Sequence, residues 1–220
     1  MLTLSTMSER KTEILEVTRK LFLEGGLANV SMRKVAAEVG VSATAIYRHY
    51  RDKDDLVAEV VIEGHRLLMS RLARALRRPS PRERMLDAGA EYLGFALAQE
   101  EYYRVMFMSW DTLDAQAHAK EQHGESPTFQ FLLTRVEEGQ AAGVIERGRD
   151  PMQVAVFLWS VCHGLAALYL AGGMRQLGED AFCGFARASL AQAIDGLAAL
   201  ARKRNRGSGL VRRRAKEKPS

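Results

Sequence analysis

Three of the five prolines in this chain stand directly after a residue that caps helices, and this punctuation constrains the fold most. The pairs are Ser80-Pro81, Ser126-Pro127 and Asp150-Pro151. Proline is pre-shaped for the first helical position, and Ser or Asp before it accepts backbone N–H groups that the first turn leaves without partners. Each pair therefore predicts the start of a helix.

Apolar residues recur at helical spacing through most of the chain. Ile14, Val17, Leu21 and Phe22 form one such stripe. No sustained alternation of apolar and polar residues, the pattern of a half-buried strand, lies between hairpin turns. The sequence thus predicts an all-α protein with helices at 8–24, 32–39, 43–49, 53–77, 82–98, 101–109, 111–120, 127–142, 151–172 and 179–203.

Composition excludes several classes of protein. No stretch reaches the ~18 consecutive apolar residues of a membrane-spanning helix. The segment from Met1 to Lys11 lacks the apolar core of a signal peptide. The two cysteines, Cys162 and Cys183, are too few for a disulfide-dense scaffold or a four-cysteine zinc site. We expect no cofactor, no bound metal, no membrane partner and a cytoplasmic location.

The net charge of +5 is unevenly distributed. After Ala201 there are nine Lys or Arg residues against one acidic residue, whereas the preceding residues hold 23 basic and 26 acidic ones. The chain is therefore not a uniformly basic globule, and a case for DNA binding must rest on a local group of residues. The basic segment 204–220 is predicted to be disordered. It could act as an arm that attracts phosphates, or it could only aid solubility.

Such a local group lies between Ser31 and Leu56. Ser31 suits the N-cap of a short helix, and Gly40 suits its C-terminal end, where a positive φ is favoured. Ser42 can cap a second short helix that turns Ala45, Ile46 and Tyr50 inward. Two short helices joined by a tight turn containing glycine form a helix-turn-helix.

The outward side of the second helix is unusual for a purely structural element. Small residues at its N-terminus would allow close approach to a DNA groove, and hydroxyl groups and helix N-termini suit phosphate oxygens. Lys53 opens the next helix and can reach a phosphate as well. The outward residues are Ala43, Thr44, Tyr47, Arg48 and His49.

The segment from Thr12 to Leu56 resembles the N-terminal DNA-binding domain of TetR-type (tetracycline-repressor family) transcriptional regulators. Tyr47 and Tyr50 stand before Lys53 as in that family, which more often has Phe at the second position. In the C-terminal part, Trp159 to Gly164 resembles the Trp-His-Gly signature of one subfamily. The resemblance implies phosphate contacts from Ser31, Ser42, Tyr47, His49 and Lys53, and base or groove contacts from Arg33, Ala43, Thr44 and Arg48.

About 140 residues follow the DNA-binding segment, and aromatic and methionine residues gather in them. Residues at helical spacing can be ordinary core, or they can line a cavity for a small apolar effector, which the resemblance implies. The aromatic and aliphatic candidates are Tyr103, Met106, Phe107, Trp110, Phe129 and Leu133. His163 fits a satisfied buried histidine, and pocket or interface hydrogen bonding is its alternative role.

The last two predicted helices contain many small residues, among them Gly164 and Gly184. Small residues let helices approach closely, so these helices are predicted to pair with those of a second copy in a homodimer. We predict three regions: a helix-turn-helix domain at 1–54, an effector-binding and dimerisation domain at 55–203, and the basic tail at 204–220.

The sequence therefore predicts a dimeric, non-enzymatic regulator, most often a repressor in this family. A small-molecule effector would release it from a palindromic operator in double-stranded DNA. The alternative is a helical ligand-binding or enzymatic bundle that does not bind DNA. An effector can shift a regulator only through its differential affinity for two states.

Overall fold

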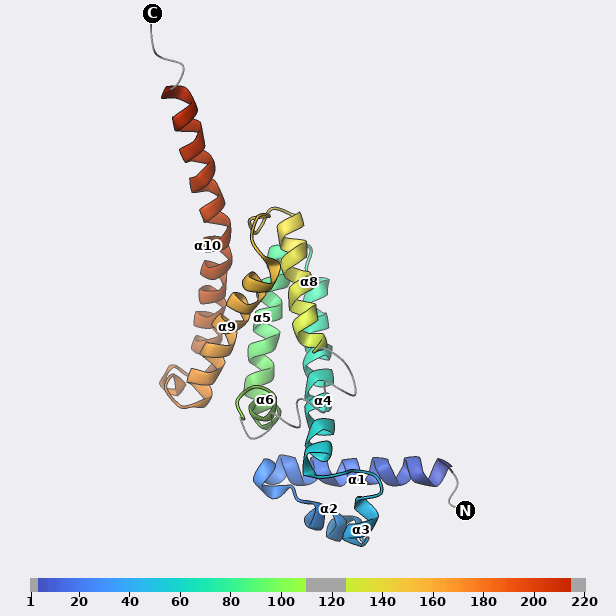
Figure 1. Cartoon of the computed structure of the whole chain (residues 1–220). Helices are drawn as coiled ribbons and strands as arrows, with labels where there is room; N and C mark the ends of the chain where they lie inside the picture. The colour runs from blue at the N-terminus through green and yellow to red at the C-terminus, as the bar shows by residue number, and fades with distance from the viewer. Residues whose placement is uncertain (1–3, 110–125, 215–220) are drawn as a thin grey trace, which may run out of the picture. The chain divides into compact units, whose positions relative to one another are not determined.

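The computed structural model describes the backbone of residues 4–109 and 126–214, and the side chains of 9–109 and 126–198. Over these residues the chain forms α-helices and short 3₁₀ helices without a strand, which confirms the all-α prediction (Figure 1). The α-helices are α1 (Leu4–Gly25), α2 (Met32–Val39), α3 (Ala43–Ile46), α4 (Lys53–Leu72), α5 (Pro81–Ala98), α6 (Glu100–Phe107), α8 (Pro127–Ala141), α9 (Pro151–Leu170) and α10 (Glu179–Arg214).

Most predicted helices match observed ones within a few residues, with two informative differences. The predicted helix 43–49 ends at Ile46, because the backbone tightens into a turn over 47–49. The predicted helix 53–77 changes at Leu72 into the 3₁₀ helix Ala73–Arg77. It stops there because Arg78 is extended (φ −76°, ψ 142°), as the residue before a proline prefers. The predicted helix 111–120 lies outside the described residues.

The end of α10 corrects the predicted start of the disordered tail. The helix continues to Arg214, past the predicted end at 203. Five of the eleven residues from 204 to 214 are arginine, which is a good helix former, and Gly207 and Gly209 weaken the helix without ending it.

The chain divides into two compact units. Unit 1 comprises residues 1–69 and 98–127, and unit 2 comprises residues 70–97 and 128–220. Unit 1 thus adds α6 and most of α4 to the three N-terminal helices. The domain boundary at 54/55 predicted from the sequence remains a proposal about which part folds independently.

Unit 1 is built around the apolar stripe of α1. Ile14, Leu21 and Phe22 are buried, as their helical spacing predicted. The Phe22 ring meets the Tyr102 ring of α6 edge to face, with centroids 5.3 Å apart. Gly64 of α4 faces the same helix, and a Cβ at that position would lie 2.4 Å from Met106 Sδ. A side chain at position 64 would therefore force the Met106 side chain to move.

Unit 2 packs α5 against α9 and α10. Cys162 of α9 and Leu190 of α10 both lie against Gly89 of α5. Burial raises the pKa of the Cys162 thiol to about 12, so this cysteine behaves as a small apolar residue. Arg82 of α5 forms a two-point ion pair with Asp195 of α10, at 2.9 and 3.0 Å. These contacts hold the last helix along α5 and α9 (Figure 1).

Candidate functional site

The two short helices of unit 1 are capped as the sequence predicted. Ser31 Oγ accepts the Lys34 backbone N–H at 3.2 Å, and Ser42 Oγ accepts that of Ala45 at 3.3 Å. Between the helices, Gly40 adopts the left-handed conformation with φ 75°. These residues produce the tight turn between α2 and α3, which lie side by side in Figure 1.

The short helix α3 is held from its inner side. Ile46 is fully buried and Tyr50 is 3% exposed, which confirms Tyr50 as a core residue. The Tyr50 hydroxyl is buried without a hydrogen-bond partner. Burial is the main cause that raises the pKa of Tyr50, with the carboxylates of Glu59 and Asp55 adding to it. A four-residue helix has little stability alone, so these contacts fix its direction.

The start of α4 is anchored next to this core. Asp52 Oδ1 accepts the Asp55 backbone N–H at 2.9 Å, and Asp55 receives a two-point ion pair from Arg51 at 2.8 and 2.9 Å. Lys53 Nζ donates to the Leu27 carbonyl oxygen at 3.0 Å. Because an ammonium group has three donors, this bond to the loop after α1 leaves Lys53 capacity for a phosphate.

The predicted DNA-contact residues form one surface on unit 1. Tyr47 is 55% exposed, although tyrosine usually buries much of its ring. Ala43 and His49 are half-buried, and the remaining members of the set are exposed: Ser31, Arg33, Ser42, Thr44, Arg48 and Lys53. We call these nine residues the recognition surface. Their individual roles on DNA remain predictions.

The predicted effector residues do not come together in one unit. Tyr103 and Met106 are buried in the core of unit 1, and Phe107 packs there against Tyr103 and His65. Phe129 and Leu133 lie half-buried on α8 of unit 2. Trp110 lies outside the described residues. The sequence showed these residues as apolar residues at helical spacing, but the spacing did not indicate which core each residue joins.

His163 lies in unit 2 with two partners that the sequence set missed. Tyr92 Oη of α5 lies 3.3 Å from His163 Nδ1, and Trp159 Nε1 donates to Tyr92 Oη at 3.1 Å. Burial lowers the pKa of His163. Trp159 and His163 are four residues apart on a helix and so share a face, which is the signal that could have joined them.

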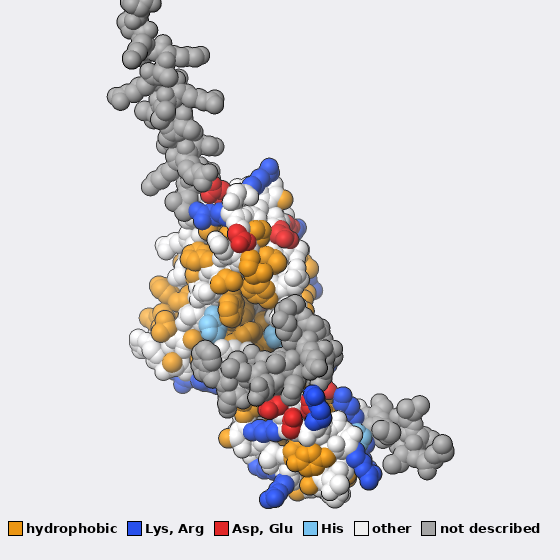
Figure 2. Space-filling model, viewed as in Figure 1, with side chains coloured by type: hydrophobic (Ala, Val, Ile, Leu, Met, Phe, Trp, Pro, Cys, Tyr) orange, Lys and Arg blue, Asp and Glu red, His pale blue; other side chains and the backbone are white. Residues whose placement is uncertain are grey.

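Another surface of unit 2 is apolar and exposed. On α9, Val156 is 42% and Leu168 54% exposed, and on α10 Phe185 is 49% exposed. A Cβ added at Gly164 or Gly184 would meet no atom within 4 Å. Figure 2 shows hydrophobic side chains gathered on the visible side of unit 2. We call the exposed side of these two helices the α9–α10 face; it comprises Met152, Val156, Phe157, Ser160, Gly164, Leu168, Gly184, Phe185 and Ala188.

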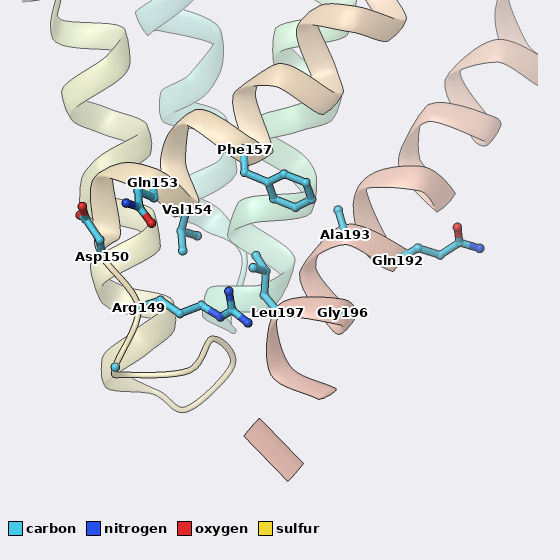
Figure 3. Close-up of a pocket in the computed structure, with 10 residues that line it drawn as sticks. Arg149, Asp150, Gln153, Val154, Phe157, Gln192, Ala193, Gly196 and Leu197 are labelled. Atoms are coloured by element: carbon cyan, nitrogen blue, oxygen red, sulfur yellow. The ribbon is translucent and has the colours of Figure 1, made fainter. Parts of the chain in front are cut away.

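An open groove adjoins this face, where α9 begins beside the second half of α10. Its volume is about 900 Å³. Val154, Phe157 and Leu197 point into it, and Arg149 projects toward Leu197 from the loop before α9 (Figure 3). None of the predicted effector residues lines this groove. Among the residues with described side chains, no three His, Cys, Asp or Glu gather as metal ligands.

Within the described part of the chain, α9 is long and apolar enough to cross a membrane by length and composition. A core helix of a soluble protein passes the same test. The outward side of α9 also carries Gln153, Ser160 and Gly164, which suit contact with another helix better than contact with lipid.

Comparison with known proteins places these features in one family. The chain matches the bacterial regulatory proteins of the tetR family over residues 14–60, and the Tetracyclin repressor-like, C-terminal domain over residues 85–196. An HTH-type transcriptional regulator of Staphylococcus aureus is 42% identical over 53 residues, which are 24% of this chain and 29% of that protein. The chain thus matches less than a third of the length of that relative.

Solved structures match over most of the chain. A Rhodococcus protein of unknown function has a TM-score of 0.67 at 26% identity, covering 86% of this chain and 95% of its own. The transcriptional regulator FadR of Bacillus subtilis, solved with stearoyl-CoA, has a TM-score of 0.64 at 14% identity, covering 84% and 98%. The second likeness shows the fold alone. Because the two family matches together span most of the chain from the recognition surface to α10, this protein belongs to the tetR family of bacterial regulatory proteins.

Proposed function

We propose that this protein is a transcriptional regulator that binds a palindromic operator as a homodimer and is released by a small-molecule effector. The recognition surface is the observation that carries the proposal. Its helix-turn-helix has both N-caps and the left-handed glycine in place, and it presents Thr44, Tyr47 and Arg48 to solvent. Repression is the expected direction of control, and the cytoplasm is the expected location because the target is DNA.

Base reading is assigned to the start of α3. A recognition helix enters the major groove with its N-terminal residues against the base edges. Ala43 is small and Thr44 is exposed there, so both can approach bases. We assign contacts with the phosphates of the DNA backbone to the N-termini of α2 and α3, with Ser31, Ser42 and Tyr47.

The α9–α10 face supports the homodimer. Exposed apolar side chains on two adjacent helices are costly in water, and small residues between them permit close helix packing. A two-fold axis through this face would produce an interface of four helices. The dimer would present two recognition helices. Such a pair reads two half-sites that are ~34–36 Å apart, which is one turn of DNA.

The effector is assigned to unit 2, where Phe129, Leu133 and His163 are the sequence candidates. The structure of FadR from Bacillus subtilis was solved with stearoyl-CoA, and its fold matches 84% of this chain. The alternative, a helical bundle without DNA binding, leaves the exposed caps and the exposed Tyr47 without a role.

The proposal is tested by titrating the protein with the DNA that flanks its own gene and recording fluorescence anisotropy at several salt concentrations. Lys53→Ala should weaken binding to all sequences and flatten the salt dependence by about one unit. Thr44→Ala should change the preferred operator sequence instead. Because Lys53 also holds the Leu27 carbonyl oxygen, thermal melting must show that the variant is folded.

Lys20→Ala is the matched control, since Lys20 is an exposed lysine of unit 1 that pairs with Glu38 at 3.5 Å. It should leave affinity and salt dependence close to those of the parent protein. Absence of any sequence-selective binding by the parent protein would favour the bundle without DNA binding. Deletion of 202–220 should preserve operator selection and reduce only overall affinity, if it has an effect.

A further inference from the structure

Two exposed lysines of unit 1 reach the same short segment from different helices. Lys34 lies in the first turn of α2, and its Nζ donates to Asn29 Oδ1. Lys53 opens α4, and its Nζ donates to the Leu27 carbonyl oxygen at 3.0 Å. Both acceptors belong to the 3₁₀ helix Leu27–Asn29, which connects α1 to α2. Two ammonium groups are therefore held beside one segment of three residues.

This segment is fixed to the end of α1. Asn29 Nδ2 donates to the Leu21 carbonyl oxygen at 2.7 Å, so Asn29 presents its Oδ1 to Lys34 in a set direction. The Asn29 side chain also lies against Gly25, where an added Cβ would come within 2.9 Å of Asn29 Cβ. The segment follows Gly26, whose φ of 63° favours glycine. The two lysines are thus anchored on a support that is itself held in place.

The pairing of charges separates these two lysines from the cations of α1. Each cation of α1 with a described side chain forms an ion pair at 2.6–3.5 Å, and the pairs are Arg10–Glu13, Lys11–Glu59, Arg19–Glu63 and Lys20–Glu38. Between Ser31 and Lys53, by contrast, four cations form no ion pair with a described carboxylate: Arg33, Lys34, Arg48 and Lys53. Three of these four belong to the recognition surface, and Lys34 is the fourth.

The lack of an ion pair at Lys34 has a structural cause. Glu38 stands four residues after Lys34 on α2, a spacing at which helical ion pairs form. Glu38 pairs instead with Lys20 of α1 at 3.5 Å. An ammonium group has three N–H donors, and within the described residues Lys34 and Lys53 each use one of them on the connecting segment. Each lysine therefore retains two donors for an anion.

An anion between the two ammonium groups would lower the energy of this arrangement. Like charges repel each other, and a shared negative charge replaces the repulsion by attraction. Hydrogen bonds between charged partners are also about twice as strong as neutral ones. Ser31, a predicted phosphate contact, follows Asn29 by two residues and is exposed. The two lysines thus adjoin a part of the recognition surface that is already assigned to the DNA backbone.

We propose that Lys34 and Lys53 together bind one phosphate of the operator, and that Lys34 is a tenth residue of the DNA interface. The segment Leu27–Asn29 supports both ammonium groups. This contact fixes the position of α2 on the DNA and reads no base, because phosphates carry no sequence information directly. The inference rests on the proposed operator binding and adds a residue that the recognition surface lacks.

Operator titration at several salt concentrations tests the role of Lys34. Lys34→Gln removes the charge but keeps an N–H donor for Asn29. It should weaken binding to all sequences about three- to tenfold and flatten the salt dependence by up to about one unit per protomer. Lys34→Arg retains the charge and should stay within about twofold of the parent protein. Arg10→Gln is the matched control, because it removes one charge from an exposed cation that is paired with Glu13, and it should change neither quantity.

Operators with a single uncharged methylphosphonate in place of one phosphate identify the bound group. One position in each half-site should weaken binding of the parent protein, and the same replacement should have little further effect on Lys34→Gln or on Lys53→Ala. Different positions for the two lysines, or no position that depends on Lys34, would overturn the inference. Thermal melting of each variant separates a loss of affinity from a loss of folding.

The parent protein separates this inference from the proposed function. If the parent selects its operator while Lys34→Gln keeps the full affinity and salt dependence, Lys34 only supports the connecting segment and the inference fails alone. If the parent shows no sequence-selective binding, the proposed function fails. The salt dependence of Lys34→Gln on non-operator DNA then still decides whether Lys34 contacts a phosphate.

Discussion

Unit 1 and unit 2 each expose one unusual surface, and the two surfaces differ in kind. The recognition surface of unit 1 carries hydroxyl groups, two arginines and a lysine around two capped helix N-termini. The α9–α10 face of unit 2 carries Val156, Leu168 and Phe185, separated by small residues. The first surface suits a hydrated polyanion, and the second suits another protein surface of the same composition.

The units also differ in how they hold their helices. In unit 1, the short helices α2 and α3 depend on their caps and on packing, and Met106 of α6 fills the space beside Gly64 of α4. In unit 2, Arg82 and Asp195 join α5 to α10 in addition to the apolar contacts, and in unit 1 the pairs Lys11–Glu59 and Arg19–Glu63 join α1 to α4. Although burial alone would raise the pKa of Asp87, Arg78 and Arg187 hold it below its ordinary value. We therefore predict that a substitution that adds a small side chain lowers the stability of unit 1 more than that of unit 2.

The largest expected effect comes from charging the α9–α10 face. The double variant Val156→Asp/Phe185→Asp should convert a dimer into a monomer, because each interface would bury carboxylates without partners. Operator affinity should fall by about 100-fold, or about 3 kcal/mol. Sedimentation velocity and operator titration measure the two effects. Leu76→Asp, at an exposed leucine outside the face, is the control and should remain dimeric.

The next prediction compares two helical glycines, one in each unit. Gly64→Ala should destabilise the protein by about 1–3 kcal/mol, because the new methyl group overlaps Met106 Sδ. Gly94→Ala should stabilise it by up to about 1 kcal/mol, since the new Cβ would lie no closer than 3.8 Å to Arg71, the nearest side chain, and alanine favours helices. Urea denaturation gives both values. Equal effects at the two sites would contradict the tight α4–α6 approach.

A smaller effect is expected from two buried tyrosines of unit 1. Tyr50→Phe should raise stability by about 1 kcal/mol, because its hydroxyl is buried without a partner. Tyr102→Phe should lower stability by a similar amount, because its hydroxyl is hydrogen-bonded to Glu63. The same denaturation measurement applies. A loss of stability in Tyr50→Phe would reveal a partner for that hydroxyl in solution.

The smallest effect concerns one half-buried histidine in each unit. Burial lowers the pKa of both His65 and His163 below the ordinary value. The unfolded chain therefore binds protons that the folded chain does not, so stability is lost as the pH falls from above the ordinary histidine pKa through the lowered one. Denaturation midpoints at about pH 7.5 and about pH 5.5 bracket this range. The double variant His65→Gln/His163→Gln should reduce the difference.

Local structure followed from the sequence because its causes are local. Ser31, Gly40 and Ser42 specify caps and a left-handed turn through their own side chains and backbones, and the structure has each of them. Asp150 before Pro151 likewise starts α9, where its carboxylate accepts the Met152 backbone N–H at 2.9 Å. The resemblance to TetR-type regulators rested on these positions.

Only the tertiary structure decided which helix packs with which. Tyr103 and Met106 have the spacing of core residues in any bundle, and the spacing could not reveal that they belong to the core of unit 1 rather than to that of unit 2. Tyr92 lies 67 residues from Trp159 in sequence, and their hydrogen bond exists because α5 and α9 are neighbours. The α9–α10 face was predicted from small residues, but the exposure of Val156 and Phe185 depends on what the rest of unit 2 leaves uncovered.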